Sequence, residues 1–480
     1  MANLKGLMKD TAIYGMSSII GRFLNYLLVP LYTAKMSASS GEYGVITNVY
    51  AWTALLLVIL TYGMETTFFR YANKQGENAN RVYSTTLWSV AFTSVLFVVM
   101  VFIFVHPIAD VFHYHDHPEY IRFMSIVVAL DAFQAIPFSY LRYQKRPIKF
   151  AALKLSFIFM NIALNCIYYL LMDGHDAGAA FFINLICTSF VTLFFYEELK
   201  GFRHGFDAQL LKRMLTYSWP ILVLGIAGIL NQTADKILFP WLYEGEDMKT
   251  QLAIYGAVAK IAMIMAMITQ AFRYAYEPLV FGKQKDKDSK DYYAAAMKFF
   301  IIFTLLAFLC VMAYIDILKR IIGRDYWEGL GVVPIVMAAE IMMGVYFNLS
   351  FWYKLIDKTI WGAIFSGIGC AALFAVNILF VPKYGYVACA WGGFAGYGIA
   401  MVLSYIVGQR FYPIKYPILD ISIYVVLTAI LFLGMHFSTA KLPLWASIVV
   451  NTILVGLFVA YAIKRDFPLK TLPIVGKYFK

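Results

Sequence analysis

Charged residues are scarce in this sequence. Only 14% of its 480 residues are Asp, Glu, Lys or Arg, and 61% are hydrophobic, whereas about a quarter of the residues in an ordinary soluble domain are charged. A soluble globular protein is therefore excluded. Fourteen membrane-spanning helices of roughly 20 residues would take about 280 residues, and the remainder is divided among short loops, so a sizeable soluble domain is excluded as well.

Motifs for catalysis and for cofactors are also missing. The sequence has no GxxxxGK[ST] loop for ATP hydrolysis, and it has no HExxH, no Gly-x-Ser-x-Gly and no nucleotide fingerprint. Its five cysteines lie in apolar runs without CxxC spacing, so we expect neither a disulfide framework nor a metal site. The sequence therefore predicts a protein that is not an enzyme and that needs no cofactor.

Apolar runs of membrane-spanning length are abundant. They lie near residues 11–33, 44–69, 83–105, 120–141, 149–171, 177–196, 214–240, 251–281, 292–316, 329–353, 359–381, 385–409, 418–437 and 444–463. Runs of this length are typical of helices that cross a bilayer. We expect an all-α integral membrane protein with about 14 transmembrane helices.

The distribution of positive charge supports this count. A net charge of +12 would suggest nucleic acid in a soluble chain, but short cytoplasmic loops of membrane proteins are also rich in Lys and Arg. With the amino terminus inside, the inner loops and tail hold 26 of the 40 Lys and Arg residues and the outer loops hold 7. One outer loop, 317–328, is basic and departs from the rule. We expect both termini in the cytoplasm, a retained first helix and no nucleic-acid partner.

Several ionisable residues lie inside or at the ends of the predicted spans. An ionised side chain near the bilayer centre costs at least about 2.5–3.5 kcal/mol, so such a residue is expected to face the bundle interior or a watery cavity. The candidate substrate-binding residues are the cations Arg22, Lys260, Arg273 and Arg70. The candidates for ion coupling or for structural ion pairs are Glu65, Asp131, Asp235, Lys236, Glu277 and Glu340.

Three of the cations sample successive depths in the membrane. At a rise of about 1.5 Å per residue, Arg22 lies about 16 Å into the first span. Lys260 lies in the outer half of the eighth span and Arg273 in its inner half. This ladder is expected of a cavity that receives an anionic group and passes it across the membrane.

A structural interpretation of these charges stays open. Arg273 and Glu277 are four residues apart, which is the spacing of an ion pair on one helix face. Asp235 and Lys236 are adjacent and can each pair with a neighbouring helix. The remaining deep acids are candidates either for proton or sodium sites or for hydrogen bonds between helices: Glu65, Asp131 and Glu340.

Short sequences recur at the second and eighth spans. Phe69-Arg70-Tyr71-Ala72 is echoed by Phe272-Arg273-Tyr274-Ala275, and Tyr-Gly occurs near the start of both, at 43–44 and 255–256. The echo agrees with two six-helix halves related by a parallel repeat. We expect an amino-terminal lobe at 1–200, a carboxyl-terminal lobe at 201–412, a terminal helix pair with its tail at 413–480, and a central cavity.

Four stretches of the sequence resemble a known family. They are Gly21-Arg22 through Pro30-Leu31-Tyr32-Thr33, Tyr62-Gly63-Met64-Glu65-Thr66 to Arg70, Asn231-Gln232-Thr233-Ala234-Asp235-Lys236, and Tyr255-Gly256-Ala257 through Gln270-Ala271-Phe272-Arg273 to Glu277-Pro278. In order and spacing they resemble the polysaccharide and oligosaccharidyl-lipid flippases of the multidrug and lipid exporter superfamily. The resemblance covers nearly the whole chain.

The resemblance implies a V-shaped, MATE-like transporter that moves undecaprenyl-pyrophosphate-linked sugars from the inner to the outer leaflet by alternating access. It implies that Arg22 and Arg273 contact pyrophosphate or acidic sugar. It also implies that the last two helices help to form a groove for the isoprenoid tail, as in the related lipid II flippases. This sequence has one arginine in its first span where the lipid II branch has several, which favours a surface polysaccharide of the O-antigen or capsule type.

The resemblance also implies partners and a location. The partners are a lipid-linked oligosaccharide, membrane lipids, H⁺ or Na⁺ where transport is ion-coupled, and other proteins of polysaccharide assembly. The location is the bacterial cytoplasmic (inner) membrane.

Two other functions remain as alternatives. An ion-coupled small-molecule or multidrug antiporter of the same superfamily would be expected to have acids, not arginines, facing its cavity. A membrane polysaccharide polymerase or ligase normally needs a long outer loop, and the longest one predicted here, 106–119, has only fourteen residues. The sequence favours the flippase over both.

Overall fold

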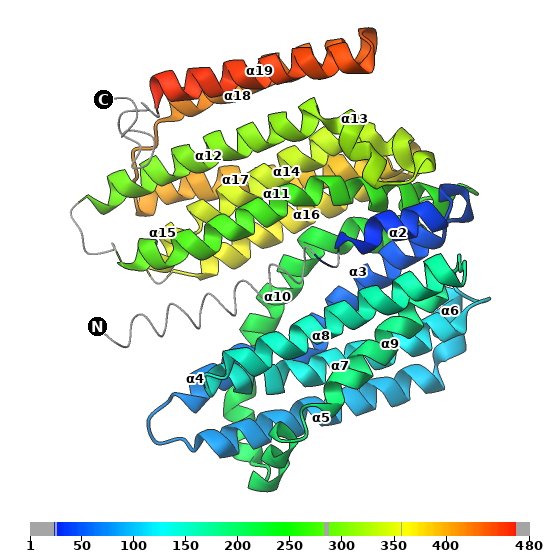
Figure 1. Ribbon diagram of the computed structural model, residues 1–480. Helices are drawn as coiled ribbons and strands as arrows, with labels where there is room; N and C mark the ends of the chain where they lie inside the picture. Colours follow the sequence, from blue (N-terminus) through cyan, green and yellow to red (C-terminus); the bar gives the residue numbers. More distant parts are fainter. Residues whose placement is uncertain (1–23, 25, 283–287, 357, 467–480) are drawn as a thin grey trace. The chain divides into compact units, whose positions relative to one another are not determined.

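The computed structural model describes residues 24, 26–282, 288–356 and 358–466, and these residues are almost entirely helical (Figure 1). No β-strand occurs within these ranges. Among the described residues, twelve helical segments are long and apolar enough to cross a membrane, and a thirteenth candidate is a pair of helices bent by 62°. Most of the first predicted span, 11–33, lies outside the described residues. The predicted all-α, multi-pass fold is confirmed, and the count of about 14 is approximate.

The described helices follow the predicted spans closely, because long apolar runs both mark and stabilise them. The first part of the chain forms α2 (Leu28–Lys35), α3 (Glu42–Thr61), α4 (Met64–Ala72), α5 (Ala79–Ile103), α6 (Val105–Val111), α7 (Pro118–Tyr143), α8 (Pro147–Cys166), α9 (Ala177–Leu193) and α10 (Ala208–Leu242). The second part forms α11 (Met248–Gly282), α12 (Ser289–Ala313), α13 (Ile315–Leu318), α14 (Val333–Leu349), α15 (Phe351–Leu355), α16 (Ile360–Tyr384), α17 (Tyr386–Phe411), α18 (Ile418–Lys441) and α19 (Leu444–Arg465). Shorter turns are η1 (Ala38–Ser40), the π-helical η2 (Ile167–Leu171), η3 (Glu198–His204), η4 (Lys319–Ile321) and η5 (Arg324–Val332).

The chain forms two compact units. Unit 1 comprises Met1–Ala257 with Leu373–Gly392, and unit 2 comprises Val258–Ala372 with Gly393–Lys480. Helices α11, α16 and α17 each contribute residues to both units. The predicted lobes, with boundaries at residues 200 and 412, stay a prediction.

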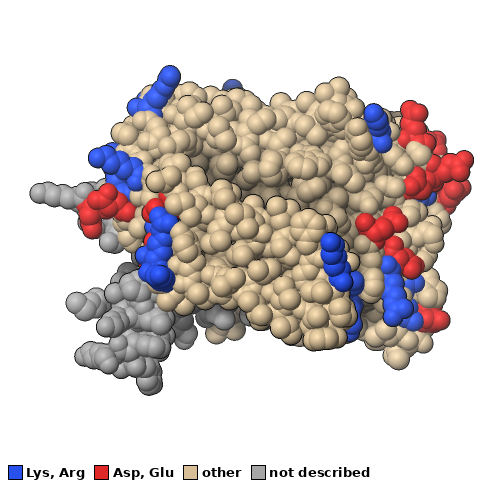
Figure 2. All heavy atoms as spheres, turned by 90° about the horizontal axis from the view of Figure 1, so that it is seen from above, with Lys and Arg blue, Asp and Glu red and all other residues tan. Residues whose placement is uncertain are grey.

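Charged side chains gather at the ends of the helices. On the face drawn in Figure 2, Lys, Arg, Asp and Glu lie along two opposite edges, and a broad band without charge separates them. Helices α18 and α19 expose large apolar side chains, for example Leu433 at 54% and Ile453 at 57%. Such exposure is stable in lipid and not in water, so the protein is a multi-pass membrane protein.

The loops of unit 1 meet at two opposite ends. At one end, Lys35 Nζ donates to Asp173 Oδ1 at 2.6 Å and so joins the end of α2 to the α8–α9 connection. This contact holds the pKa of the exposed Asp173 carboxyl below its usual range. At the other end, Arg213 pairs with Glu77 at 2.7 Å and joins α10 to the α4–α5 loop. The second end carries the loops that the charge pattern predicts to be cytoplasmic.

The second predicted span, 44–69, is broken in unit 1. Tyr62 and Gly63 have φ angles of 32° and 73° between α3 and α4. A Cβ on Gly63 would lie 3.0 Å from the side chain of Ile221 and 3.1 Å from the carbonyl oxygen of Ser218, both on α10. Glycine is therefore required here both by the left-handed backbone and by the close approach of α10.

Two glycines pack α3 against the start of α11 in unit 1. A Cβ on Gly44 would lie 2.3 Å from the carbonyl oxygen of Lys249, and a Cβ on Gly256 would lie 2.2 Å from the Thr47 hydroxyl oxygen. Small residues allow membrane helices to approach this closely. The two Tyr-Gly pairs of the sequence thus mark a contact between the second and eighth spans.

We expect Gly44→Ala to destabilise the protein by about 1–3 kcal/mol, because the added methyl group meets a backbone carbonyl that cannot rotate away. Gly228→Ala on α10 is the control, since no atom lies within 4 Å of its built Cβ. Thermal unfolding of the purified protein in detergent measures both. Equal unfolding temperatures for the two variants would contradict the close-packing account.

The terminal helix pair of unit 2 is held by a network of ion pairs. Lys298 of α12 lies 2.8 Å from Asp420 of α18 and 2.5 Å from Asp466, which follows α19. The Tyr424 hydroxyl donates to Asp466 at 2.6 Å. The ammonium group at the edge of the predicted span 292–316 is thus satisfied, and it fixes α18 and α19 against α12.

The basic loop 317–328 folds into the short helices η4 and η5. Lys319 pairs with Asp316 at 2.5 Å, and its ammonium lies 4.6 Å from the centre of the Trp327 ring. One of the three cations that depart from the positive-inside rule is therefore neutralised by an acid of α13, just before the loop.

Candidate functional site

Three charged side chains from α11 and α15 form a group in unit 2. Arg273 Nε lies 3.5 Å from Glu277 Oε2, and Lys354 Nζ lies 3.8 Å from Glu277 Oε1. The Arg273 guanidinium also lies 5.0 Å from the centre of the Phe347 ring. The three charged side chains are partly exposed, at 45%, 34% and 28% for Arg273, Glu277 and Lys354. One carboxylate between two cations leaves positive charge in excess, so the group can attract an anion.

The predicted pair of Arg273 and Glu277 is present, but it is not isolated. Because Glu277 is shared with Lys354, the carboxylate does not neutralise both cations. Lys354 was predicted only as a charge of an inner loop. It is far from Glu277 in the sequence, so no local spacing signals the contact.

Lys260 and Arg273 lie on one helix but not on one face. Thirteen residues of regular helix place them about 20 Å apart along the axis of α11 and about 140° apart around it. Lys260 is half-buried, as is Glu340 on α14. A single helix face therefore does not carry both cations of the predicted ladder.

The other two predicted substrate-binding residues belong to the first part of the chain. Arg22 lies outside the described residues. Arg70 is exposed at the end of α4, and its guanidinium lies 4.0 Å from the centre of the Tyr217 ring on α10. This contact with an aromatic ring holds Arg70 near one end of unit 1. That end also carries the basic loops.

A second charged cluster, in unit 1, has balanced charge. Arg142 lies 3.3 Å from Glu65 Oε2, and Ser139 Oγ donates to the same oxygen at 3.3 Å. Lys154 interacts electrostatically with both Asp131 and Glu65. Two acids and two cations thus come together from α4, α7 and α8. These ion pairs can hold the helices together. Alternatively, a small cation can bind the two acids and displace a proton from them or the ammonium group of Lys154.

The adjacent Asp235 and Lys236 form an ion pair with each other. Lys236 Nζ lies 2.9 Å from Asp235 Oδ2, and the Tyr255 hydroxyl of α11 donates to this same oxygen at 2.6 Å. The Asn48 amide of α3 donates to the Lys236 carbonyl at 2.7 Å. Asp235 is 7% exposed. These contacts join α3, α10 and the start of α11 within unit 1, so the geometry suits a structural ion pair.

The chain matches a family model described as polysaccharide biosynthesis protein over residues 7–276, which is more than half of its length. The chain belongs to the polysaccharide biosynthesis protein family. Among curated proteins, no sequence match is significant.

This member of the polysaccharide biosynthesis protein family also resembles solved transporter structures. The lipid II flippase MurJ, in an inward closed conformation, matches with a TM-score of 0.74 and 14% identity, covering 94% of this chain and 98% of that one. An inward-facing multidrug resistance MATE transporter of the MOP superfamily matches with a TM-score of 0.66 and 13% identity, covering 81% and 94%. A MOP superfamily transporter from Pyrococcus furiosus matches with a TM-score of 0.51 and 15% identity, covering 84% and 95%.

At these identities the structural likeness shows the fold. The polysaccharide biosynthesis protein has a fold like those of MurJ and the MATE transporters, and the predicted MATE-like fold is confirmed. Two of the solved structures that it resembles are described as a flippase and a multidrug resistance transporter. That the protein is not an enzyme stays a prediction.

Proposed function

We propose that this protein is a flippase for undecaprenyl-pyrophosphate-linked oligosaccharide repeat units. It moves them from the inner to the outer leaflet of the bacterial cytoplasmic membrane for the synthesis of a surface polysaccharide. Both of its termini are cytoplasmic. The observation that carries this proposal is the excess positive charge of the Arg273, Glu277 and Lys354 group in a chain of the polysaccharide biosynthesis protein family.

In this proposal the protein works by alternating access with a cationic cavity. Arg22 and Arg273 bind the pyrophosphate. Arg70 binds the anion before it reaches these two arginines, and Lys260 binds it afterwards. Guanidinium groups suit this role because they hold phosphate oxygens with two parallel hydrogen bonds. Lys260 and Arg273 face different sides of α11. In this proposal the anion therefore moves partly around the helix when it passes from one cation to the other.

A cation-coupled antiporter of small molecules is the second candidate. The match to a MATE transporter and the Glu65 and Asp131 cluster of unit 1 favour it, because paired acids in a membrane helix bundle are typical of proton or sodium sites. The flippase proposal uses the same acids for coupling to H⁺ or Na⁺. The two candidates differ in whether the cargo is an anionic lipid or a cation.

The proposal is tested by deleting the gene in its natural host. We expect the surface polysaccharide to disappear and its lipid-linked repeat units to accumulate in the inner leaflet, where an outer-surface lectin does not reach them. Restoring the wild-type gene should reverse both effects. Normal surface polysaccharide in the deletion strain, with no second gene of this family expressed, would contradict the proposal.

We expect an inside-negative potential to drive export without a gradient of H⁺ or Na⁺. A cargo with two negative charges that leaves such a compartment gains about 2.3 kcal/mol per charge per 100 mV. The measurement is flipping in vesicles that contain the lipid-linked cargo, with a potassium diffusion potential as the only driving force. A rate that does not change with voltage would contradict potential-driven export and assign the driving force to an ion gradient.

A further inference from the structure

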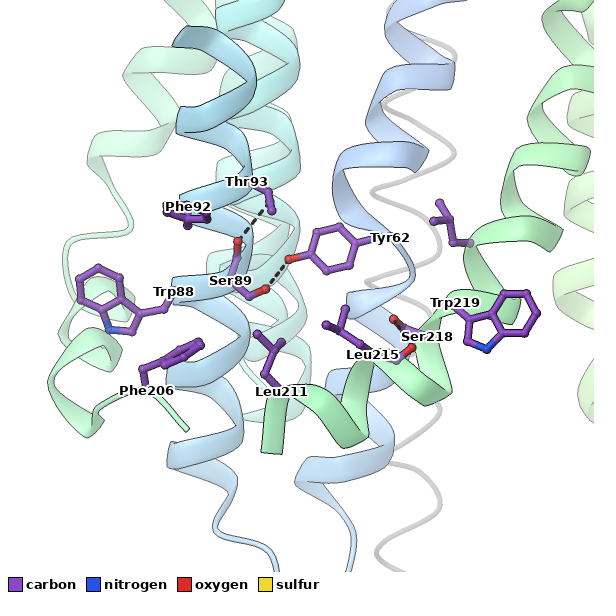
Figure 3. Close-up of a pocket in the computed structure, with 11 residues that line it drawn as sticks. Tyr62, Trp88, Ser89, Phe92, Thr93, Phe206, Leu211, Leu215, Ser218 and Trp219 are labelled. Carbon is purple, nitrogen blue, oxygen red and sulfur yellow. Dashed lines mark hydrogen bonds between the residues drawn. The ribbon is translucent and has the colours of Figure 1, made fainter. Parts of the chain in front are cut away.

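An apolar groove of about 760 Å³ opens on unit 1 between α5 and α10 (Figure 3). Its volume lies within the roughly 300–1,000 Å³ that is usual for sites that bind a single ligand. It is lined by Tyr62, Trp88, Ser89, Phe92, Thr93, Phe206, Leu211, Leu215, Ser218, Trp219 and Leu222. None of these residues has a role in the proposed transport.

The groove offers almost nothing to a polar ligand. The Tyr62 hydroxyl and Ser89 Oγ are hydrogen-bonded to each other at 2.6 Å, and Thr93 Oγ1 donates to the Ser89 carbonyl at 3.1 Å. Figure 3 shows these groups between the aromatic and aliphatic walls. Phe92 and Trp219 are 68% and 61% exposed. The hydroxyl groups already have partners, so the groove suits a hydrocarbon chain.

The groove is short along α5. Its lining on this helix runs from Trp88 to Thr93, and five residues of helix rise about 8 Å. The first turns of α10 cross obliquely beside α5 and form the other wall (Figure 3). The groove therefore holds a segment of one acyl chain, whereas a long polyprenyl chain would extend far beyond it.

Two cations adjoin lining or wall residues in the sequence, before and within the first turns of α10. Lys212 lies between Leu211 and Leu215 on α10, and Arg203 follows Phe202, whose ring centre is 4.7 Å from that of Trp88. Both cations are exposed. Within the described ranges no acid lies within salt-bridge distance of either, whereas two nearby arginines are paired, Arg81 with Asp207 at 3.3 Å and Arg213 with Glu77 at 2.7 Å.

We propose that this groove binds an anionic phospholipid of the membrane, with one acyl chain between α5 and α10 and the phosphate at Arg203 and Lys212. The chain packs against Tyr62, which lies at the break between α3 and α4. The bound lipid therefore stabilises the broken second span. The site does not depend on which cargo the protein carries.

Native mass spectrometry of the full-length purified protein tests this site. Phosphatidylglycerol and phosphatidylcholine with identical acyl chains are the probes, and we expect the first to be retained more strongly. Arg203→Gln and Lys212→Gln should each weaken binding of phosphatidylglycerol roughly five-fold, and together roughly 25-fold, without affecting phosphatidylcholine. Lys145→Gln, an exposed lysine on another loop of the same end, is the control and should change nothing.

A second pair of variants tests the apolar part of the site. Leu215→Trp fills the groove and should lower retention of both lipids, whereas Leu224→Trp places the same side chain on α10 outside the lining and should not. Equal retention of the two lipids by the wild type would overturn the proposal. Binding of a polyprenyl phosphate that phosphatidylglycerol does not displace would also overturn it. A dimer of the wild type that Leu215→Trp abolishes and Leu224→Trp does not would overturn it as well.

Discussion

Replacing Asp235 by alanine is expected to destabilise the protein by about 1–3 kcal/mol, because it removes a buried carboxylate that accepts hydrogen bonds from two side chains. The carboxylate of Asp235 accepts hydrogen bonds from Lys236 Nζ at 2.9 Å and from the Tyr255 hydroxyl at 2.6 Å. Its removal takes this acceptor from both donors at the junction of α3, α10 and α11, and Lys236 Nζ keeps only the longer contact with the Gln232 carbonyl, at 3.3 Å. The measurement is the unfolding temperature of the purified protein, together with its abundance in the membrane.

Two variants give this prediction its controls. Asp247→Ala removes an exposed aspartate that also accepts from a tyrosine, Tyr243 at 3.0 Å, and it should cost less than about 1 kcal/mol. Asp235→Asn keeps the size and shape of the side chain and removes its charge. Its unfolding temperature should lie between those of the wild type and Asp235→Ala. A normal unfolding temperature for Asp235→Ala, with transport lost, would contradict the structural ion pair and assign Asp235 to ion coupling.

Replacing Arg273 by alanine is expected to reduce flipping roughly ten- to hundredfold, as expected for the loss of a hydrogen bond of about 1.5–3 kcal/mol to a charged group. The effect on stability should be less than about 1 kcal/mol, because the ion pair with Glu277 is 3.5 Å long and partly exposed. Arg273→Lys should retain part of the activity, since it keeps the charge but loses the two-pronged geometry.

Arg410→Ala is the matched control for Arg273→Ala. Arg410 is an exposed arginine in the last turn of α17, and its removal should leave flipping unchanged. Both variants are compared at equal abundance, by transport into vesicles. Wild-type flipping by Arg273→Ala would remove this arginine from the path of the cargo. Wild-type flipping by Lys354→Ala would show that the second cation of the group is dispensable.

The membrane spans were predictable because their signal is local. Apolar runs of about 20 residues mark a helix without reference to the rest of the chain, and the predicted run 418–437 appears as α18, Ile418–Lys441. The break between α3 and α4 was not predicted. Its only local sign is Tyr62-Gly63 within an apolar run, and the close approach of α10 that requires this glycine is a tertiary feature.

The candidate site was predictable only where partners are close in sequence. The four-residue spacing of Arg273 and Glu277 predicted their contact. The contacts of Lys354 with Glu277 and of Arg142 with Glu65 join different helices, so no spacing rule reveals them. The assignment of Arg22, Arg70, Lys260 and Arg273 to substrate binding stays a prediction.

The repeated Tyr-Gly pairs were interpreted as a trace of internal repetition. The structure gives them a packing role as well, because Gly44 meets the backbone at Lys249 and Gly256 meets Thr47. A repeat and a contact leave the same mark in a sequence. Only the spatial arrangement shows that the second and eighth spans use these glycines to approach each other.

The most direct test of this account is the choice of cargo by the purified protein in vesicles. The protein is offered either a fluorescent polyprenyl-pyrophosphate-linked oligosaccharide or a fluorescent lipophilic cation, under the same potential and ion gradients. The account predicts that the anionic lipid is moved, that the cation is not, and that Arg273→Ala abolishes most of the transport. Transport of the cation, with no movement of the lipid-linked oligosaccharide, would contradict it.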